Sequence, residues 1–286
     1  MTNPPIRLLG LGDNTVDIYV DRNIMFPGGN AVNVAVLAKR LGSAAGYLGC
    51  LGNDAFGSLL HDALSAEGVD LSRCRRIDGE NAHVLVRHRD GDREFVKSTA
   101  GVRARYELDA GDFAYIKGFD VVHSSYCSDN DAMIPAIAAA ATRLSYDFSN
   151  RWTDDRRTRL APHVDIAFLS HAGHPDPECI EVLRQWSSAG PRTVVMTRGG
   201  DGAFAYVNGT LYRQDVLPTP VVDTLGAGDA FIAGFLTRYL ADGAVQPALQ
   251  SGARTAAAAC GWLGGFGHGI PITGLSPEEM SLSARS

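Results

Sequence analysis

Lysine is nearly absent from this sequence of 286 residues, which has only three: Lys39, Lys97 and Lys117. Acidic side chains outnumber Lys and Arg by 32 to 26, and the formal net charge is −6. Nucleic acids and anionic membrane surfaces attract basic proteins, so this balance argues against both as partners. Any anionic ligand must therefore be held mainly by arginine, by backbone amides or by a metal ion.

Long apolar runs are also missing, because no stretch reaches the ~20 residues that a membrane-spanning helix needs. The first ten residues, MTNPPIRLLG, do not have the basic and then apolar pattern of a secretory signal. The five cysteines are scattered and form no C-x-x-C pair, which predicts reduced and mostly buried thiols. We therefore expect a cytoplasmic protein.

The sequence has no internal repeat and no interdomain linker, and its length suits one large domain spanning residues 1–286. From about residue 119, apolar strand-like runs alternate with helical patterns, as in FDVVHSSY, DAMIPAIAAAATRL, SYDFS and VDIAFLS. Two further helices are expected at roughly 226–241 and 245–263. This alternation predicts an α/β fold, with a mostly parallel central sheet, helices on both faces and ligands at the carboxyl ends of the strands.

Two segments depart from this alternation. NAHVLVRHRDGDREFVKS alternates apolar and polar residues and is expected to turn at Asp90-Gly91, which is typical of a β-hairpin. A half-solvated hairpin in an otherwise strand–helix chain predicts a small sheet outside the main layer. AAGYLGCLG is expected to form one short strand.

Several familiar motifs fail when their context is tested. GLGDNT (residues 10–15) resembles the start of a dinucleotide fingerprint but lacks the third glycine and leads into a strand. No glycine precedes a lysine, which excludes a Walker P-loop, and there is no G-x-S-x-G elbow. HAGH contains His171 and His174, but the sequence shows no partner ligand for zinc, so a plain loop is the preferred interpretation.

The stretch DTLGAGDAFIAGF places two glycines and a carboxylate where a helix begins. Phe231, Phe235 and Tyr239 give that helix an apolar face, so its polar chemistry is confined to the first turn. Helix-start amides favour an anion, and the carboxylate of Asp229 could accept a proton beside it, which suits phosphoryl transfer. The structural alternative is that the glycines only ease packing and Asp229 only caps the helix.

DTLGAGDAF resembles the signature of the PfkB (ribokinase-like) carbohydrate kinases, and GDNTVD followed by GGNAVNVA resembles the N-terminal signature of the same family. The resemblance runs from about Leu8 to Gly269, with the motifs in the family's order. It implies an ATP-dependent phosphotransferase acting on an alcohol group, with a core of sheet and helices and a small β lid at about 13–27 and 80–99.

The resemblance also assigns residues. It implies that Asp229 is the catalytic base, and that the anion hole is formed by Gly226, Ala227 and Gly228. The substrate would be bound by Asp17, Gly29, Asn30 and Asn33, because carboxylates and amides bond well to sugar hydroxyls.

For the nucleotide, TRGGDG matches the family's phosphate loop and implies contacts from Thr197, Gly199 and Gly202. Asp223 matches a residue beside a monovalent-cation site near the loop GGFGHG, which points to K⁺. Arg198 departs from the apolar residue common in that loop; we expect it to point into solvent, and the alternative is that it adds positive charge beside phosphate. Mg²⁺ should accompany ATP, but the family's N-x-x-E motif is missing, since Ser170 and Gly173 replace its asparagine and glutamate. Asp176 and Glu178 are the remaining candidates for Mg²⁺.

Stretches such as GDNTVDIY and YDFSNRW resemble family members that act on fructosamines such as fructoselysine, at the 6-position. The amine portion would then lie near Tyr126 and Asp147, with Asp147 or Asp13 as its acidic partner. Exposed lid strands need a cover, which predicts a homodimer formed through the lid. Two alternatives remain: a kinase for a free sugar or a nucleoside on the same fold, and an inactive nucleotide- or sugar-binding regulator.

Overall fold

The computed structural model describes residues 4–89, 92–276 and 278–280. Its core is an eight-stranded sheet with the order β14-β13-β12-β11-β10-β9-β1-β4. The strands from β4 to β12 in that order are parallel, whereas β13 is antiparallel to β12 and β14 is antiparallel to β13. The strands are β1 (Arg7–Leu11), β4 (Ala44–Leu48), β9 (Val121–Ser125), β10 (Leu144–Ser149), β11 (Ile166–Ser170), β12 (Thr193–Thr197), β13 (Ala203–Val207) and β14 (Thr210–Gln214).

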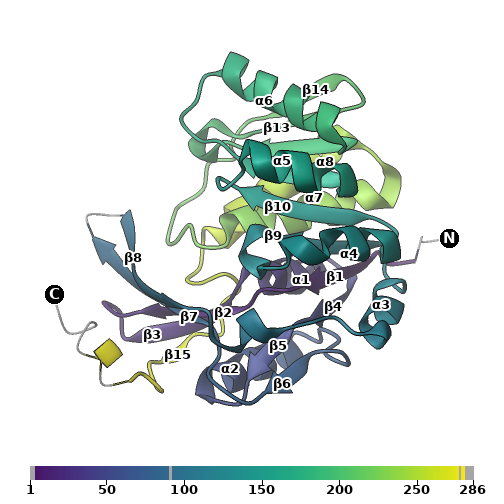
Figure 1. Cartoon of the computed structure of the whole chain (residues 1–286). Helices are drawn as coiled ribbons and strands as arrows, with labels where there is room; N and C mark the ends of the chain where they lie inside the picture. Colours follow the sequence, from purple (N-terminus) through teal and green to yellow (C-terminus); the bar gives the residue numbers. More distant parts are fainter. Residues whose placement is uncertain (1–3, 90–91, 277, 281–286) are drawn as a thin grey trace.

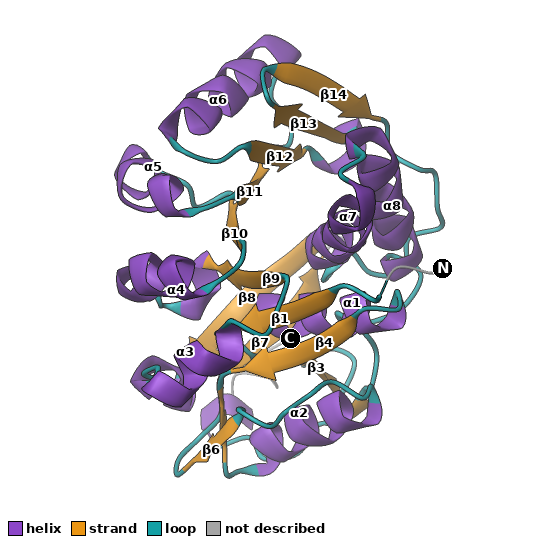
Figure 2. Cartoon of the chain, turned by 90° about the vertical axis from the view of Figure 1, so that its right-hand side faces the viewer, coloured by secondary structure: helices purple, strands orange, loops and turns teal. Residues whose placement is uncertain are grey.

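Helices cover both faces of this sheet (Figure 2). One face carries α3 (Ala110–Ile116), α4 (Ile134–Ala140), α5 (Asp154–Leu160) and α6 (Asp176–Ala189), and the other carries α1 (Asn30–Arg40), α7 (Ala227–Asp242) and α8 (Val245–Ala259). Each set packs its apolar side chains into a separate buried cluster. The predicted α/β architecture is confirmed. Among the described residues, no helix is both long and apolar enough to cross a membrane.

A second sheet has five strands in the order β15-β3-β2-β7-β8 and extends away from the core (Figure 1). Its strands are β2 (Thr15–Tyr19), β3 (Ile24–Gly28), β7 (His83–Arg89), β8 (Asp92–Thr99) and β15 (Ile270–Pro271). The two-residue strand β15 was not predicted, because its sequence carries no alternating pattern. The predicted turn at Asp90-Gly91 lies outside the described residues.

One predicted strand was wrong. AAGYLGCLG forms β4 and then β5 (Cys50–Gly52), which pairs with β6 (Arg75–Ile77) in a separate two-stranded sheet. The chain leaves the main sheet at Gly49, where a Cβ atom would lie 2.2 Å from the Tyr47 hydroxyl. Only glycine fits there, so the break follows from packing. Helix α2 (Ala55–Ala66) comes next in the chain.

Glu279 ties the end of the described chain to the second sheet. Its Oε1 lies 2.7 Å from His83 Nε2 in β7, and its Oε2 accepts hydrogen bonds from the backbone N–H and hydroxyl of Ser276. Burial alone would raise the pKa of Glu279, but the hydrogen bonds from His83 and Ser276 outweigh it and lower the pKa to about 2. The ionised form of Glu279 therefore stabilises the fold.

We expect Glu279→Gln to lower the free energy of unfolding at pH 7 by about 1.5–3 kcal/mol, the typical contribution of hydrogen bonds to a charged group. The pKa of Glu279 in the fold is below its ordinary value of 4.5. Its contribution is therefore complete above that value and is lost as the pH falls toward about 2.

Urea unfolding of both proteins at pH 7 and at pH 3 measures this difference, which should shrink at the lower pH. Glu278→Gln is the matched control, because the Glu278 side chain is 77% exposed and should contribute little. Equal stability of wild type and Glu279→Gln at pH 7 would contradict the assigned role.

Candidate active site

The N-termini of two helices meet at the carboxyl end of the main sheet. Helices α1 and α7 pack against each other, and each begins after a glycine with positive φ, Gly29 at 108° and Gly226 at 75°. A Cβ atom on Gly29 would lie 2.6 Å from Asn14 Cα, and one on Gly226 would lie 2.8 Å from Gly265 Cα. Both the backbone conformation and the close packing therefore demand glycine, and they bring the first turns of the two helices together.

Asp229, in the first turn of α7, is held by two asparagines of α1. Asn30 Nδ2 donates to Asp229 Oδ1 at 2.8 Å, and Asn33 Nδ2 donates to Oδ2 at 2.6 Å. Burial raises the pKa of Asp229 to about 6, and the charge of Asp13 adds to the rise, while the two asparagines oppose it. Asp229 is therefore a carboxylate with a fixed orientation and a pKa not far below neutral pH.

The Asn30 side chain contacts a second carboxylate. Its Nδ2 also donates to Asp147 Oδ2 at 3.0 Å, and its Oδ1 lies 2.9 Å from His123 Nε2. Since Nδ2 faces two carboxylates, Oδ1 is the acceptor, and the His123 Nε2–H is its donor. His123 Nδ1 then accepts from the Ser145 hydroxyl at 2.9 Å. Burial lowers the pKa of His123 to about 3, so the imidazole is neutral, as this chain of bonds requires.

Asp147 lies at the end of β10, where the sequence places it. Its pKa is raised to about 7, mainly by burial and also by the charge of Asp229, while hydrogen bonds from Ser149 N–H and Asn30 oppose the rise. Oxygens of Asp147 and Asp229 contact one nitrogen at 3.0 and 2.8 Å, so these oxygens are no more than about 6 Å apart. Tyr126 follows Ser125, the β9 residue that pairs with Asp147. The structure thus brings the predicted Tyr126 and Asp147 to one edge of the sheet.

Asp13 is fully occupied by the protein itself. Its carboxylate accepts from the backbone N–H groups of Asn30 (2.7 Å) and Ala31 (3.2 Å), and from the hydroxyls of Ser125 (3.1 Å) and Ser128 (3.0 Å). It therefore caps the N-terminus of α1, which Gly29 cannot do because it has no side chain, and it anchors the start of that helix. These contacts make Asp13 an anchor for the start of α1, and its expected role as a partner for a substrate amine stays a prediction.

The other predicted substrate residues surround Gly29. Asp17 in β2 is 5% exposed, and a Cβ atom on Gly28 would lie 2.3 Å from Asp17 Oδ2. Asn33 is 3% exposed, and a Cβ atom on Gly265 would lie 2.5 Å from its Oδ1. Its geometry makes Asn33 a support for Asp229 beneath the glycine-rich loop.

A cavity of about 610 Å³ adjoins Asp229. It is lined at one end by Ala227 and Gly228 of α7, and further along by Thr197, Gly199 and Gly202 after β12 and by small side chains of α8. A Cβ atom on Gly228 would meet nothing within 4 Å, so the backbone there faces open space. The Ala227 N–H donates to the Thr224 carbonyl at 3.3 Å. The amides of Gly228 and Asp229, in the first turn of α7, have no intrahelical acceptor, and the anion hole of Gly226, Ala227 and Gly228 stays a prediction.

Asp223 braces the loop before α7. Its Oδ2 accepts from the Tyr19 hydroxyl at 2.5 Å and from Gly264 N–H at 3.1 Å, and its Oδ1 accepts from Leu225 N–H at 3.0 Å. It thereby joins the second sheet, the α7 loop and the glycine-rich loop.

The loop between β11 and α6 stands where the family's N-x-x-E motif is expected. Neither of the two acidic candidates that follow it extends over the cavity. Asp176 pairs with Arg198 at 2.9 Å and also with Arg213. Glu178 pairs with His171 at 3.1 Å and His174 at 2.8 Å. The prediction that Arg198 points into solvent was wrong: it is 7% exposed and stacks on Phe204, 4.4 Å from the ring centroid.

His123 and Ser145 were missed by the sequence reasoning. Both lie in strands whose sequences show no alternation of polar and apolar residues. Their interaction becomes evident only when β9 is paired with β10. Glu178 was likewise not recognised as a partner of the HAGH histidines, because the turn into α6 brings it back to them.

Comparison with known proteins gives consistent results. Residues 6–265 match the model of the pfkB family of carbohydrate kinases. The chain is 40% identical to fructosamine kinase FrlD of Bacillus subtilis (strain 168), over 93% of this chain and 95% of that protein. It is 37% identical to fructoselysine 6-kinase of Escherichia coli (strain K12), over 87% and 95%. The structure of Arabidopsis thaliana ribokinase complexed with ribose and ATP is similar in fold, with a TM-score of 0.80, 19% identity and full coverage of both chains.

We expect Asn30→Ala to raise the pKa of both Asp147 and Asp229, because this substitution removes hydrogen bonds that stabilise the ionised carboxylates. Carboxyl ¹³C chemical shifts followed through a pH titration measure the change. Gln185→Ala is the control, since that amide donates only to the surface carboxylate of Glu181. Unchanged titration of both aspartates in Asn30→Ala would show that Asn30 does not couple them.

Proposed function

Because the chain belongs to the PfkB family of carbohydrate kinases, we propose that it is an ATP-dependent fructosamine kinase that phosphorylates the 6-hydroxyl of fructoselysine or a close relative. The observation that carries the proposal is the pair Asp147 and Asp229, joined by one amide of Asn30, with Gly228, the neighbour of Asp229 in the chain, lining a large cavity. A fructosamine has a hydroxyl to deprotonate and a positively charged amine to bind. The two carboxylates suit these two groups.

Asp229 acts as the base for the acceptor hydroxyl. Asn30 and Asn33 hold both of its oxygens, so its orientation is set before substrate arrives. A pKa of about 6 leaves it ionised at pH 7, yet basic enough to accept a proton as the hydroxyl attacks. The amides of Gly228 and Asp229, at the positive end of α7, stabilise negative charge beside it.

The cavity fits a nucleotide. Its volume of about 610 Å³ suits a small-molecule ligand, and the small side chains of α8 and the glycines at 199, 202 and 228 let a ligand approach the backbone. ATP with Mg²⁺ supplies the phosphoryl group when bound.

The cations expected at the site are Mg²⁺ and K⁺. Asp176 and Glu178 are both committed to other side chains, so we propose that Mg²⁺ reaches the site on ATP and is held by the protein through water. We further propose that K⁺, if bound, takes carbonyl oxygens near the loop 264–269. Asp223 would then stabilise that loop, since it already accepts from Tyr19, Leu225 and Gly264.

Asp147 is the proposed partner of the substrate amine. It is 9% exposed, so a protonated amine that reaches it leaves water and needs a charged partner there. Binding a cation would favour the ionised form and lower the raised pKa of Asp147. Tyr126, beside it, offers a half-buried aromatic surface. Asp17, at the start of the second sheet, remains the proposed partner of sugar hydroxyls.

The second sheet is the proposed lid. The Tyr19 hydroxyl of β2 donates a hydrogen bond to Asp223 next to α7, so movement of this sheet would be transmitted to the site. Strand β8 lies at one end of the sheet order, where it presents a strand edge. This supports the proposal that a second subunit covers the lid in a homodimer.

The alternatives differ in their use of Asp147. A kinase for free fructose or ribose has no cation to bind, so a buried carboxylate at this position would only be costly. A silent regulator would not need Asp229 at a pKa of about 6 between two amide donors. The first observation favours a fructosamine kinase over a kinase for a free sugar, and the second favours a kinase over a silent regulator.

Asp229→Asn removes the base while keeping the size of the side chain. We expect kcat to fall about 10²–10⁴-fold, with ATP binding largely retained. In wild type, kcat/KM should rise as the pH increases through about 6, because Asp229 must be ionised to accept the proton. Coupled kinase assays across pH measure both effects.

The control for this variant is Asp242→Asn, at the other end of α7, where the carboxylate pairs with Arg238. It should leave the rate unchanged. Wild-type turnover by Asp229→Asn would exclude Asp229 as the base.

Substrate choice is tested by comparing fructoselysine with fructose and ribose. We expect kcat/KM for fructoselysine to be at least about tenfold higher, the effect of one charge-assisted hydrogen bond. Asp147→Asn should lose most of this preference while its kcat/KM for fructose changes little. Equal efficiency of the wild type on fructose and fructoselysine would overturn the fructosamine assignment and favour a general fructokinase.

A further inference from the structure

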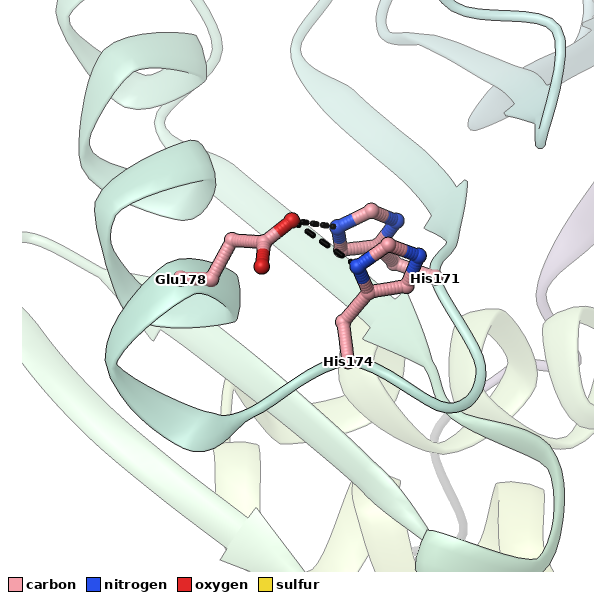
Figure 3. A group of neighbouring side chains, drawn as sticks. All are labelled: His171, His174 and Glu178. Atoms are coloured by element: carbon pink, nitrogen blue, oxygen red, sulfur yellow. Dashed lines mark hydrogen bonds and ion pairs between the residues drawn. The ribbon is translucent and has the colours of Figure 1, made fainter.

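Two histidines and a glutamate converge on one point outside the proposed active site. His171 Nε2 and His174 Nδ1 lie 3.1 and 2.8 Å from the same oxygen, Oε1 of Glu178 (Figure 3). The two imidazole rings are stacked, with centroids 3.6 Å apart and an interplanar angle of 11°. One ligand atom from each of the three residues lies within 4.8 Å of the others. The nitrogens that face Glu178 are therefore side by side.

The backbone holds the three side chains in this arrangement. His171 follows β11, and its N–H donates to the Thr197 carbonyl at 2.9 Å. The His174 carbonyl accepts from Arg198 Nη2 at 3.0 Å, and Glu178 lies in the first turn of α6. Trp152 packs edge-on against the His171 ring at 5.1 Å, and the His171 side chain is only 12% exposed. The arrangement thus rests on several elements of the fold.

We propose that His171, His174 and Glu178 form a binding site for a divalent transition metal of the Zn²⁺ class. Two imidazoles and one carboxylate are a common set for zinc, with the fourth position open to water or another ligand. Zinc bonds of about 2.0–2.1 Å place tetrahedral ligand atoms about 3.3 Å apart. Two of the present separations, 2.8 and 3.1 Å, are already close to that value. A small outward shift of Glu178 would admit the ion.

This site is separate from the Mg²⁺ that accompanies ATP. Imidazole nitrogen favours zinc, copper, nickel and cobalt, whereas Mg²⁺ prefers oxygen ligands. Ser170 and Ala172, which flank His171, line the cavity, but the three ligands do not. A bound metal would therefore fix the loop at the margin of the cavity and leave the catalytic carboxylates untouched. The site does not depend on the proposed kinase function.

The test uses the full chain without a histidine tag, freed of metal by a chelator. Calorimetric titration with Zn²⁺ gives the stoichiometry and affinity, and titration with Co²⁺ gives visible absorption bands that report tetrahedral coordination. Both are run with and without millimolar Mg²⁺. We expect one ion per chain, tetrahedral Co²⁺ bands and little competition from Mg²⁺.

Two variants remove ligands, His174→Gln and Glu178→Gln, and each should weaken Zn²⁺ binding at least about tenfold. His61→Gln is the matched control: the His61 and His174 side chains are both 44% exposed, and His61 also neighbours a carboxylate, Asp62. It should bind Zn²⁺ like the wild type. Two ligand variants guard against a local folding defect in either one.

The proposal is overturned if the ligand variants bind Zn²⁺ as tightly as the wild type, or if His61→Gln weakens binding equally. It is also overturned if Mg²⁺ displaces the ion or if Co²⁺ shows only octahedral bands. Any of these results would mean that Glu178 and the histidines form an ion-pair cluster, with weak surface chelation only.

Discussion

The site depends on one side chain, the amide of Asn30, which donates from a single nitrogen to two carboxylates, buried Asp147 and half-buried Asp229. Burial raises the pKa of both carboxylates, and a neighbouring charge adds to each rise, that of Asp229 for Asp147 and that of Asp13 for Asp229. The amide can serve both only if its oxygen faces the opposite way, and neutral His123 supplies the donor that fixes this orientation. A hydrogen-bond chain from Ser145 in the main sheet therefore sets the geometry of Asp147 and Asp229.

The rest of the fold delivers Asn30 to that position. Asp13 anchors the start of α1 through the amides of Asn30 and Ala31, and Gly29 allows the turn from β3 into the helix. Gly226 likewise allows the turn into α7, and Gly265 packs against it. Asp223 joins that region to the second sheet through Tyr19. The proposed base, the proposed anion site and the proposed lid are thus parts of one connected structure.

Much of this could be predicted from the sequence, because strand–helix alternation, turn residues and a glycine-rich helix start are local signals. The main sheet, the hairpin strands β7 and β8 of the second sheet and the placement of Asp229 at the start of α7 follow from them. The parts that sequence reasoning missed depend on tertiary contacts. His123 looks like an ordinary strand residue until β9 is paired with β10, and the anchoring role of Asp13 is evident only once α1 is placed above it. Arg198 was expected in solvent, yet Phe204 and Asp176, both distant in sequence, enclose it.

The central claim is that Asp229 faces the hydroxyl to be phosphorylated while Asp147, across Asn30, faces the amine of the same substrate. A crystal structure with fructoselysine and a non-hydrolysable ATP analogue tests it most directly. The account predicts the 6-hydroxyl within hydrogen-bond distance of Asp229, the amine beside Asp147 and the terminal phosphate toward Gly228. A substrate bound in the opposite direction, with its amine at Asp229, or an amine in solvent with Asp147 unengaged, would contradict it.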